Sequence, residues 1–522
     1  MAETAKRYNS ILNIIDKRLI PDDVAKKLRG EVFTPLNLVR EMLFGIRKGS
    51  KKEDEIEIWG IDKEGNFFDD DEKNRIGGIP LSVWRDPKTT WLDPANGIGN
   101  FPVVVFYMLD YQLGKHGPKE FKGDDNKVKR RRHIVKNMLF MIELNKGNVN
   151  TSRKIFEKIV PGAIPNILCA NTLKMTDASL KNEFGINKFD VVMGNPPYNQ
   201  GGIKRPDTRR NKKVGPYEDE KKEKKETIWN KFVIQSYEKL KPNGFLIFIH
   251  PIGWFHSGDY DNVREILFNK QISYIRIYHK TQSKAVFKGS GEISVAYYCL
   301  ENKPSTKPTI IKGMNGDEEI VELHSESILL LNNSSIINKI INKYPFWKDN
   351  KNFKHKSNTC SKPGEFKQIK GIYDDGTIPV VRVSTEHEDQ DIPKIIISGA
   401  TYPRIYYDEK GEYGLIGTGV NYWIGGEKEL KLLNSFLKTK LAAFLTKELR
   451  FRQGFVEFKY FPDITEFKGK ITDETLASHF EFSVEEKNII KERDYPERQY
   501  KFIEVKCKEG GSRNVTRRKS RQ

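Results

Sequence analysis

The chain has 522 residues, of which 31% are charged and 37% are hydrophobic. This composition excludes a disordered protein, and the length predicts two or three domains. The formal net charge of +19 favours a polyanion such as nucleic acid as the partner, although a lysine-rich surface without any ligand would carry the same charge.

The sequence has no apolar run of about 18 residues, so we expect no contact with a membrane. The first residues lack an apolar signal core, and we therefore expect a cytoplasmic protein. Four scattered cysteines lack the paired spacing of a zinc site or a disulfide framework, so we expect no metal. They are Cys169, Cys299, Cys360 and Cys507.

In chain order, the pattern first predicts a helical region at 1–30 and an amphipathic helix at 35–44, followed by a polar surface excursion at 47–75. Short apolar runs then predict strands at 90–92, 138–142, 167–170, 190–193, 244–250, 274–278 and 293–299. Amphipathic stretches at 103–113, 151–159 and 229–240 predict the helices between them. This alternation predicts an α/β domain with a mostly parallel sheet covered on both faces. The last two strands lack a long helix between them and are expected to pair antiparallel at one edge.

An insertion at 116–132 ends in the basic run 127–132, which is either a nucleic-acid contact or a solvated surface. The alternation stops near residue 300. We expect a catalytic domain at 1–300, a mixed α+β domain at 301–505 and a basic disordered tail at 506–522.

The most specific motif follows the apolar strand 190–193 and reads Asn195-Pro196-Pro197-Tyr198. Two prolines fix the backbone just past a strand end, where open α/β sheets bind their ligands. The side-chain oxygen of Asn195 and the carbonyl of Pro196 can accept from both hydrogens of an exocyclic amine such as that of adenine, which is otherwise a poor nucleophile. Tyr198 offers a face on which an extruded base can stack. A tight turn that merely closes a strand is the alternative.

A second motif, at 91–101, is a strand that ends in Asp93 and enters a helix through Ala95, Gly97, Gly99 and Phe101. It has neither the glycine spacing of a dinucleotide site nor that of a P-loop. The loop instead suits a nucleoside joined to an amino acid, as in S-adenosylmethionine.

A third signal is Glu143, which ends the next predicted strand and can accept from both ribose hydroxyls. Its separation from Gly99 exceeds the usual spacing because of the insertion at 114–133. A merely solvated glutamate is the alternative reading.

Together these segments resemble the gamma-class amino-methyltransferases, the adenine methylases of restriction-modification systems, over about residues 30–300. The resemblance implies a doubly wound Rossmann-like sheet, S-adenosylmethionine as the cofactor and transfer of its methyl group to N6 of a flipped-out adenine in double-stranded DNA. It also implies that 30–35 is the segment contacting the methionine carboxylate through Thr34 and Pro35, and that 167–173 contacts the adenine ring. Asn171 stands there in place of the usual aspartate.

The same resemblance assigns 244–251 and Trp254 to the back of the target-base pocket and Phe287 to the loop that covers the flipped base. The mixed C-terminal domain would be the target-recognition domain. The expected DNA contacts are Lys204, Arg205, Arg209 and Arg210 after the catalytic loop, and Arg382, Arg404, Arg450 and Arg452 in the second domain. A cognate restriction endonuclease is a possible partner, and we expect a monomer.

Several alternatives remain open at this point. The Asn-Pro-Pro-Tyr string also occurs in methyltransferases for RNA adenine and for protein glutamine, but the basic charge and the extra domain disfavour glutamine. Cytosine N4 enzymes more often carry Ser or Asp in place of Asn195, and no cysteine lies near the motif for a carbon-5 route. A fused endonuclease lacks a recognisable metal motif, and a dead methyltransferase would not need these motifs intact.

Overall fold

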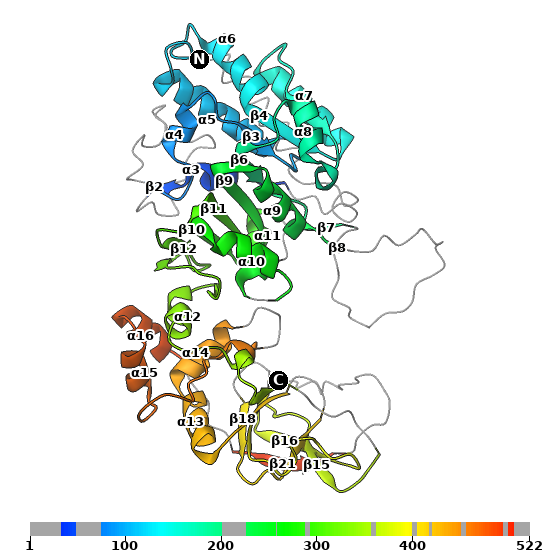
Figure 1. Ribbon diagram of the computed structural model, residues 1–522, viewed down its shortest axis with the longest axis vertical. Helices are drawn as coiled ribbons and strands as arrows, with labels where there is room; N and C mark the ends of the chain where they lie inside the picture. Colours follow the sequence, from blue (N-terminus) through cyan, green and yellow to red (C-terminus); the bar gives the residue numbers. More distant parts are fainter. Residues whose placement is uncertain are drawn as a thin grey trace, which may run out of the picture. The chain divides into compact units, whose positions relative to one another are not determined.

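The computed structural model describes residues 33–47, 75–200, 226–256, 258–287, 293–355, 362–398, 404–416, 420–449, 456–493 and 499–505. It divides into two compact units, Met1–Asn332 and Asn333–Gln522, which are considered separately (Figure 1). The described part of the chain contains no helix that is both long and apolar enough to span a membrane. The helical region predicted at 1–30 and the tail predicted at 506–522 lie outside the described residues, as does nearly all of the excursion predicted at 47–75.

The first unit is built on a nine-stranded sheet with the order β13-β12-β10-β11-β9-β6-β3-β4-β5. Its strands are β3 (Trp91–Asp93), β4 (Leu139–Glu143), β5 (Asn166–Cys169), β6 (Phe189–Gly194), β9 (Leu240–Pro251), β10 (Lys270–Tyr278), β11 (Val295–Pro304), β12 (Thr309–Lys312) and β13 (Glu318–Val321). All seven strands predicted from the sequence are present, with ends shifted by a few residues.

The neighbouring strands β5, β4, β3, β6 and β9 are all parallel to one another, whereas β11 runs antiparallel to both β9 and β10. The central strands β3 and β6 are buried along nearly their whole length, because both faces of a parallel sheet are covered by the crossover helices. Their sequences are therefore continuous apolar runs and do not alternate with polar residues.

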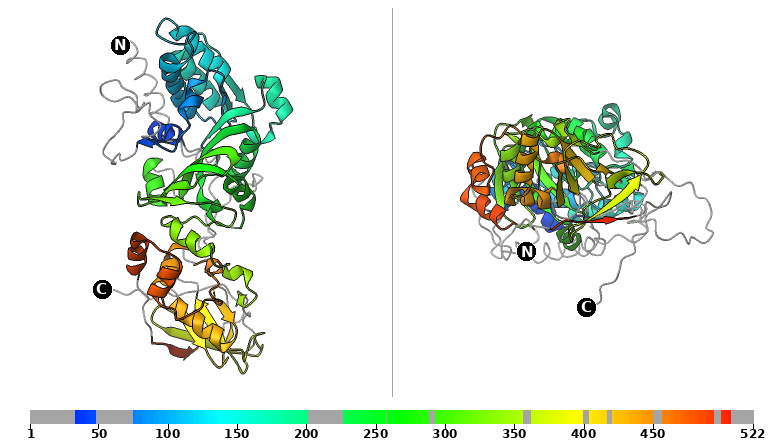
Figure 2. Two further views of the ribbon diagram at one scale, coloured as in Figure 1. Left: turned by 60° about the vertical axis from the view of Figure 1, so that its left-hand side comes forward. Right: turned by 90° about the horizontal axis from the view of Figure 1, so that it is seen from below.

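Helices cover both faces of this sheet (Figures 1 and 2). On one face α3, α5 and α7 share a hydrophobic cluster with Trp91, Met141 and Val191. On the other face, Leu92 and Ile142 border a small cavity together with residues of α8 and α9. The sheet is thus doubly wound, as the sequence predicts.

The described residues of this unit also form helices, short helical turns and two small strand pairs. The helices are α3 (Leu36–Phe44), α4 (Leu81–Arg85), α5 (Asn100–His116), α6 (Lys127–His133), α7 (Lys146–Ile159), α8 (Asp177–Phe184), α9 (Trp229–Glu238), α10 (Asp261–Phe268) and α11 (Lys280–Val286). The short helical turns are η2 (Ile134–Met138), η3 (Thr172–Lys174) and η4 (Ile252–Phe255). Two small strand pairs are β1 (Ile46–Arg47) with β2 (Arg75–Ile76), and β7 (Asn199–Gln200) with β8 (Glu226–Thr227).

Two expectations about the end of this unit are wrong. Strands β10 and β11 do pair antiparallel, but they are not at the edge, because β12 and β13 extend the sheet beyond β10. For the same reason the first unit continues to Asn332 and does not stop at residue 300. The polar composition of 301–335 hid these strands, since an edge hairpin with one solvated face needs few apolar residues.

The second unit contains two four-stranded sheets, with the orders β14-β20-β17-β18 and β19-β15-β16-β21. Their strands are β14 (Phe353–Lys354), β15 (Phe366–Ile369), β16 (Thr377–Val383), β17 (Lys394–Ser398), β18 (Arg404–Asp408), β19 (Gly414–Leu415), β20 (Val420–Ile424) and β21 (Lys501–Glu504). The helices are α12 (Ser334–Ile341), η5 (Trp347–Asp349), α13 (Glu427–Leu437), α14 (Lys440–Glu448), η6 (Phe458–Tyr460), α15 (Asp473–His479) and α16 (Val484–Lys491). The described residues of this unit form a mixed α and β domain, as predicted.

A buried ion pair fixes the turn that follows β18. Lys394 and Asp408 are 0% and 2% exposed, with Nζ and Oδ2 3.5 Å apart. The backbone N–H groups of Glu412 and Tyr413 donate to Asp408 at 2.9 and 3.0 Å, and Lys394 donates to the carbonyl of Tyr413. Burial raises the pKa of Asp408 and lowers the pKa of Lys394, so the two groups depend on one another to stay charged.

We expect Asp408→Ala to lower the free energy of unfolding of this unit by about 3 kcal/mol, because it leaves a buried ammonium without its counter-ion and two N–H groups without their acceptor. Urea unfolding followed by tryptophan fluorescence measures this loss. Lys431→Gln, which removes the exposed pair of Lys431 with Glu427, serves as the control and should not move the transition. Equal midpoints for Asp408→Ala and the control would contradict the assigned role.

Candidate active site at the carboxyl ends of the central strands

The chain reverses its direction across the sheet between β3 and β6. After β3 it builds β4 and β5 on one side, and it then returns to place β6 and β9 on the other. The carboxyl ends of the two strands at such a reversal form a crevice where open α/β sheets bind ligands. Gly194 has φ 154°, and a Cβ atom built on it would lie 3.0 Å from Oδ1 of Asp93. The two most specific sequence motifs therefore meet in one crevice.

The loop after β3 requires glycine at two positions. Gly97 and Gly99 have φ 57° and φ 100°, in the left-handed region that other residues rarely adopt. A Cβ atom on Gly99 would lie 2.9 Å from Oγ of Ser152, and one on Gly97 would lie 3.0 Å from the ring of Phe33. The loop is consequently held between α7 and the segment that precedes α3.

Glu143 ties this loop to the end of β4. Its Oε2 accepts from the backbone N–H of Gly97 at 2.8 Å, and its Oε1 accepts from that of Asn145 at 2.7 Å. The next residue, Leu144, keeps 67% of its surface exposed. A carboxylate and an apolar side chain thus stand together at the end of the strand that neighbours β3.

Thr34 and Pro35 lie beside the same loop, at the N-terminus of α3. The carbonyl of Thr34 accepts from Nδ2 of Asn100 at 2.7 Å, which joins the segment to the start of α5. Further along α3, Oε1 of Glu41 accepts from the hydroxyl groups of Tyr297 and Tyr278 at 2.8 and 3.1 Å. These bonds anchor α3 to β10 and β11 and so fix where Thr34 lies.

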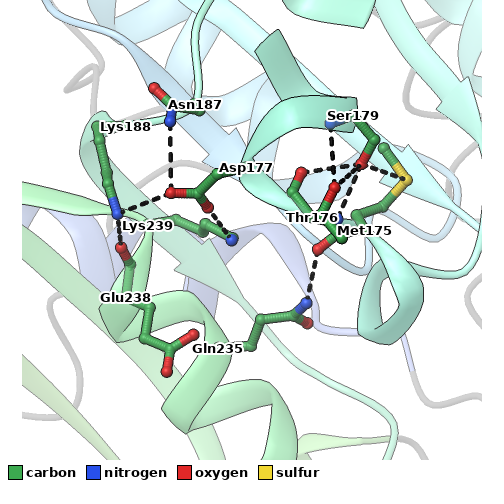
Figure 3. Close-up of polar contacts among 9 residues, drawn as sticks. All are labelled: Met175, Thr176, Asp177, Ser179, Asn187, Lys188, Gln235, Glu238 and Lys239. Carbon is green, nitrogen blue, oxygen red and sulfur yellow. Dashed lines mark hydrogen bonds and ion pairs between the residues drawn. The ribbon is translucent and has the colours of Figure 1, made fainter. Parts of the chain in front are cut away.

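Asn171 lies at the end of β5, and its Oδ1 accepts from the backbone N–H of Leu173 at 3.0 Å. The turn that follows is held by α9, because Nε2 of Gln235 donates to the carbonyl of Met175 at 3.0 Å (Figure 3). The side chain of Lys239 bonds Asp177 in the same view and lowers the pKa of that carboxyl. The segment at 171–177 is thereby set against the face of the sheet that carries α9.

The segment Asn195–Tyr198 leaves β6 with Pro196 buried and its neighbours half-buried. The carbonyl of Tyr198 accepts from the N–H of Ile228 at 3.1 Å, and burial raises the pKa of the Tyr198 hydroxyl. The adjacent Trp229 stacks on His250, with ring centroids 4.4 Å apart. Burial lowers the pKa of His250 to about 3, so this imidazole is neutral and supports the loop through its aromatic face.

Five buried polar atoms around this crevice have no hydrogen-bond partner among the described residues. They are Oγ1 of Thr34, Oδ2 of Asp93, Oδ1 of Asn96, Oδ1 of Asn100 and the hydroxyl of Tyr198. Leaving a buried polar group unsatisfied costs about 1–3 kcal/mol, so such a concentration is typical of a site that a polar ligand completes. Burial also raises the pKa of Asp93 to about 8.

Other predicted site residues lie elsewhere or are not described. Phe287 ends α11, is 3% exposed and packs in the cluster that also contacts Tyr198. In the second unit, Arg382 is exposed and pairs with Glu504 at 2.9 Å. Arg404 is buried and donates to the carbonyl of Ile372 and to the carboxylate of Asp374. These bonds hold the first residue of β18 in place. The predicted contacts Lys204, Arg205, Arg209, Arg210, Arg450 and Arg452 lie outside the described residues.

Three residues of the crevice escaped the sequence analysis. Asn96 and Asn100 are buried at 4% exposure beside the glycines, and Leu144 is exposed beside Glu143. An asparagine next to a loop glycine reads as turn chemistry, and one exposed leucine needs no explanation, so neither pattern pointed to a ligand. Within the described ranges, no group of three or more His, Cys, Asp or Glu side chains is placed to hold a metal ion.

The chain is similar to known methylases in sequence. Residues 119–287 match the family described as Eco57I restriction-modification methylase, whereas no curated protein matches. The matched residues include Glu143, Asn171 and Asn195, whereas the loop that carries Gly97 and Gly99 lies before the match.

Solved structures with a similar fold include a modification subunit of a putative type I restriction enzyme from Vibrio vulnificus, at 17% identity and a TM-score of 0.35, with 58% of this chain and 50% of that one covered. A putative class I S-adenosylmethionine-dependent methyltransferase from Listeria monocytogenes has 17% identity and a TM-score of 0.29, covering 44% and 61%. The restriction-modification enzyme MmeI, solved with DNA, has 11% identity and a TM-score of 0.40, covering 73% and 61%. The chain spans about half the length of the first of these relatives.

The residues present fit S-adenosylmethionine. Its ammonium group and ribose hydroxyls are hydrogen-bond donors, and the unpaired atoms of Asp93, Asn96 and Asn100 are acceptor oxygens. The exposed side chain of Leu144 offers an apolar surface against which the adenine ring of this cofactor could pack. The first unit therefore has a Rossmann-like fold with a crevice whose residues fit S-adenosylmethionine, and its residues 119–287 are similar to the Eco57I restriction-modification methylases.

We expect the cofactor product S-adenosylhomocysteine to protect Cys169 from alkylation by iodoacetamide. The thiol is exposed at the end of β5, with its Sγ 3.8 Å from the carbonyl of Leu144. Peptide mass spectrometry gives the rate at each cysteine, and Cys360 and Cys507 serve as internal controls. Equal protection of all three thiols, or none at Cys169, would contradict this placement of the cofactor.

Proposed function

We propose that the protein is a site-specific DNA methyltransferase that transfers a methyl group from S-adenosylmethionine to N6 of a flipped-out adenine in double-stranded DNA, as in restriction-modification systems. The observation that carries the proposal is the contact between Gly194 and Asp93, which brings the cofactor loop against the strand leading into Asn195. A methyl donor at that loop and an amine at Asn195 would be neighbours.

In this mechanism the cofactor supplies an electrophilic methyl group on a sulfonium. The side chain of Asn195 and the carbonyl of Pro196 accept from the two N6 hydrogens of adenine, which concentrates the nitrogen lone pair and offsets its developing positive charge. The lone pair would form the new bond to the methyl carbon as the carbon–sulfur bond breaks, the electron pair of that bond would remain on the sulfur of S-adenosylhomocysteine, and the amine would then lose a proton to solvent. The chain forms no covalent bond to the base, and its contribution is alignment and electrostatics.

Within the cofactor site, we assign Asp93 to the methionine ammonium and Glu143 to the ribose hydroxyls. Thr34 and Pro35 would lie at the methionine carboxylate, with Ala95, Gly97, Gly99 and Phe101 shaping the loop. Asn171 would lie at the adenine end, and Tyr198 and Phe287 at the target base. This assignment is supported by the unpaired buried oxygens of Thr34 and Asp93.

The partners follow from the same proposal. Double-stranded DNA is the substrate, the second unit is the target-recognition domain, and a cognate restriction endonuclease is a possible companion of a monomeric methylase. The net charge of +19 supports a nucleic-acid substrate. RNA adenine is the alternative that the experiment below distinguishes.

We expect Asn195→Ala to lower turnover by about 100-fold or more while cofactor and DNA affinity stay unchanged, since Asn195 acts on the reacting amine. Long-read sequencing of DNA from cells expressing either protein shows whether N6-methyladenine appears at one short motif. Asn182→Ala, at an exposed position of α8, is the matched control and should methylate normally. Full activity of Asn195→Ala would overturn the mechanism, and methylation of RNA alone would overturn the substrate.

Cofactor affinity should rise with pH. Burial raises the pKa of Asp93 to about 8, so in the free protein this carboxyl carries a proton at neutral pH and must lose it to accept from an ammonium group. The Kd for S-adenosylhomocysteine should therefore fall by up to about tenfold per pH unit between roughly pH 6 and 8, and then level off. Titration calorimetry measures this trend. Asp93→Asn should bind S-adenosylhomocysteine weakly, with a Kd that does not depend on pH. A Kd of the wild-type protein that is equally independent of pH would refute the role of Asp93.

A further inference from the structure

The insertion between α5 and β4 forms a compact basic surface that the proposed reaction does not use. Its cations are Lys115, Lys119, Lys122, Lys127, Lys129, Arg131, Arg132 and Lys136, whereas its acidic residues are Glu120, Asp124 and Asp125. We call the part from Lys115 to Lys136 the amino-edge platform. Most of these cations are exposed, including Lys119, Lys122 and Arg132.

The platform is held from within by a buried guanidinium. Arg130 is 5% exposed and bonds Oδ1 of Asp110 on α5 at 2.7 Å, while its Nη1 donates to the carbonyls of Phe121 and Gly123 at 2.8 Å. Asn126 likewise donates to the carbonyls of Lys119 and Lys122. The backbone of the loop is therefore turned inward and bonded, which leaves the lysine side chains to project outward from a fixed frame.

The cations also share a direction. Lys129, Arg132 and Lys136 follow one another at spacings of three and four residues along α6 and η2, so they lie on one helical face over about 10 Å. Nζ of Lys129 lies 5.6 Å from the centre of the Phe121 ring, which places it next to the loop that carries Lys119 and Lys122. A row of cations on a rigid support matches the evenly spaced phosphates of a nucleic-acid backbone.

The platform lies at the amino ends of the parallel strands, whereas the crevice lies at their carboxyl ends. Helix α6 and η2 lead into the amino end of β4, whereas Asn195 follows the carboxyl end of β6, and these strands point the same way because each is parallel to β3. A duplex whose adenine enters the crevice near Tyr198 contacts the carboxyl ends of the strands through the DNA segment that carries this adenine. Phosphates at the amino edge must belong to another stretch of nucleic acid.

We propose that the amino-edge platform binds the sugar-phosphate backbone of a duplex DNA segment distinct from the one that carries the target adenine. Such a contact reads no sequence, and it raises the affinity for long DNA by adding phosphate contacts away from the target site. The inference rests on DNA as the substrate of the proposed function. Its test measures binding alone and does not depend on turnover.

The test compares the full-length protein with the variant Lys119→Gln, Lys122→Gln, Lys129→Gln on a fluorescent duplex of random sequence. The slope of log affinity against log salt should become shallower by about 2 to 3, and binding near physiological salt should weaken by at least about tenfold. The matched control is Lys154→Gln, Lys181→Gln, Lys307→Gln, which removes three exposed lysines of the first unit that lie outside the platform. It should leave both quantities near the wild-type values.

Each other outcome has a defined meaning. An unchanged slope in the platform variant overturns the proposal and leaves an acidic protein as the partner of this surface. An equal loss in the control variant also overturns it, because the effect would then belong to net charge. Tighter platform-dependent binding of duplex RNA than of DNA would overturn the assignment to DNA. If the platform variant loses DNA affinity while the wild-type protein methylates no DNA, the proposed function fails and the platform as a DNA-binding surface stands.

Discussion

The close approach of Asp93 to Gly194 is the constraint on which the crevice depends. Parallel pairing of β3 with β6 puts the two strand ends side by side, and a Cβ atom at Gly194 would lie only 3.0 Å from the Asp93 carboxylate there. The strand that leads to Asn195 is thereby brought to the loop that carries Gly97 and Gly99. The order of strands in the sheet, more than any single hydrogen bond, decides that these two loops share one space.

The other contacts of the crevice act on this arrangement. Glu143 fixes the loop from the β4 side, and Asn100 fixes it from the α3 side by bonding the carbonyl of Thr34. The anchor at Glu41 then ties α3 to β10 and β11 through two tyrosine hydroxyls. Helix α3 thus forms a wall of the same crevice although it lies far from β3 in the sequence. The hydrophobic cluster beneath this helix resists rearrangement because buried side chains are closely packed.

Much of this architecture could be predicted from the residues. Continuous apolar runs such as 190–193 predict strands buried on both faces, and glycines beside a strand-terminal aspartate predict a ligand loop. The hairpin β12–β13 could not be predicted in the same way, because its exposed Ile320 and charged neighbours resemble a loop. Arg404 was expected at DNA, yet it is buried against Ile372; charge alone does not reveal whether an arginine has an internal partner. The unpaired oxygens of Asn96 and Asn100 depend on tertiary burial and have no pattern in the sequence.

The unsatisfied oxygens in the crevice would also link the lifetime of the protein to its cofactor. Each buried acceptor without a donor lowers the stability of the ligand-free fold, and a cofactor that fills them returns that stability by mass action, with a gain that grows with the ratio of its concentration to its dissociation constant. The abundance of the folded enzyme would then follow the methyl-donor supply of the cell. A cell starved of methionine would hold less of the protein through local unfolding and proteolysis, before any change in its synthesis.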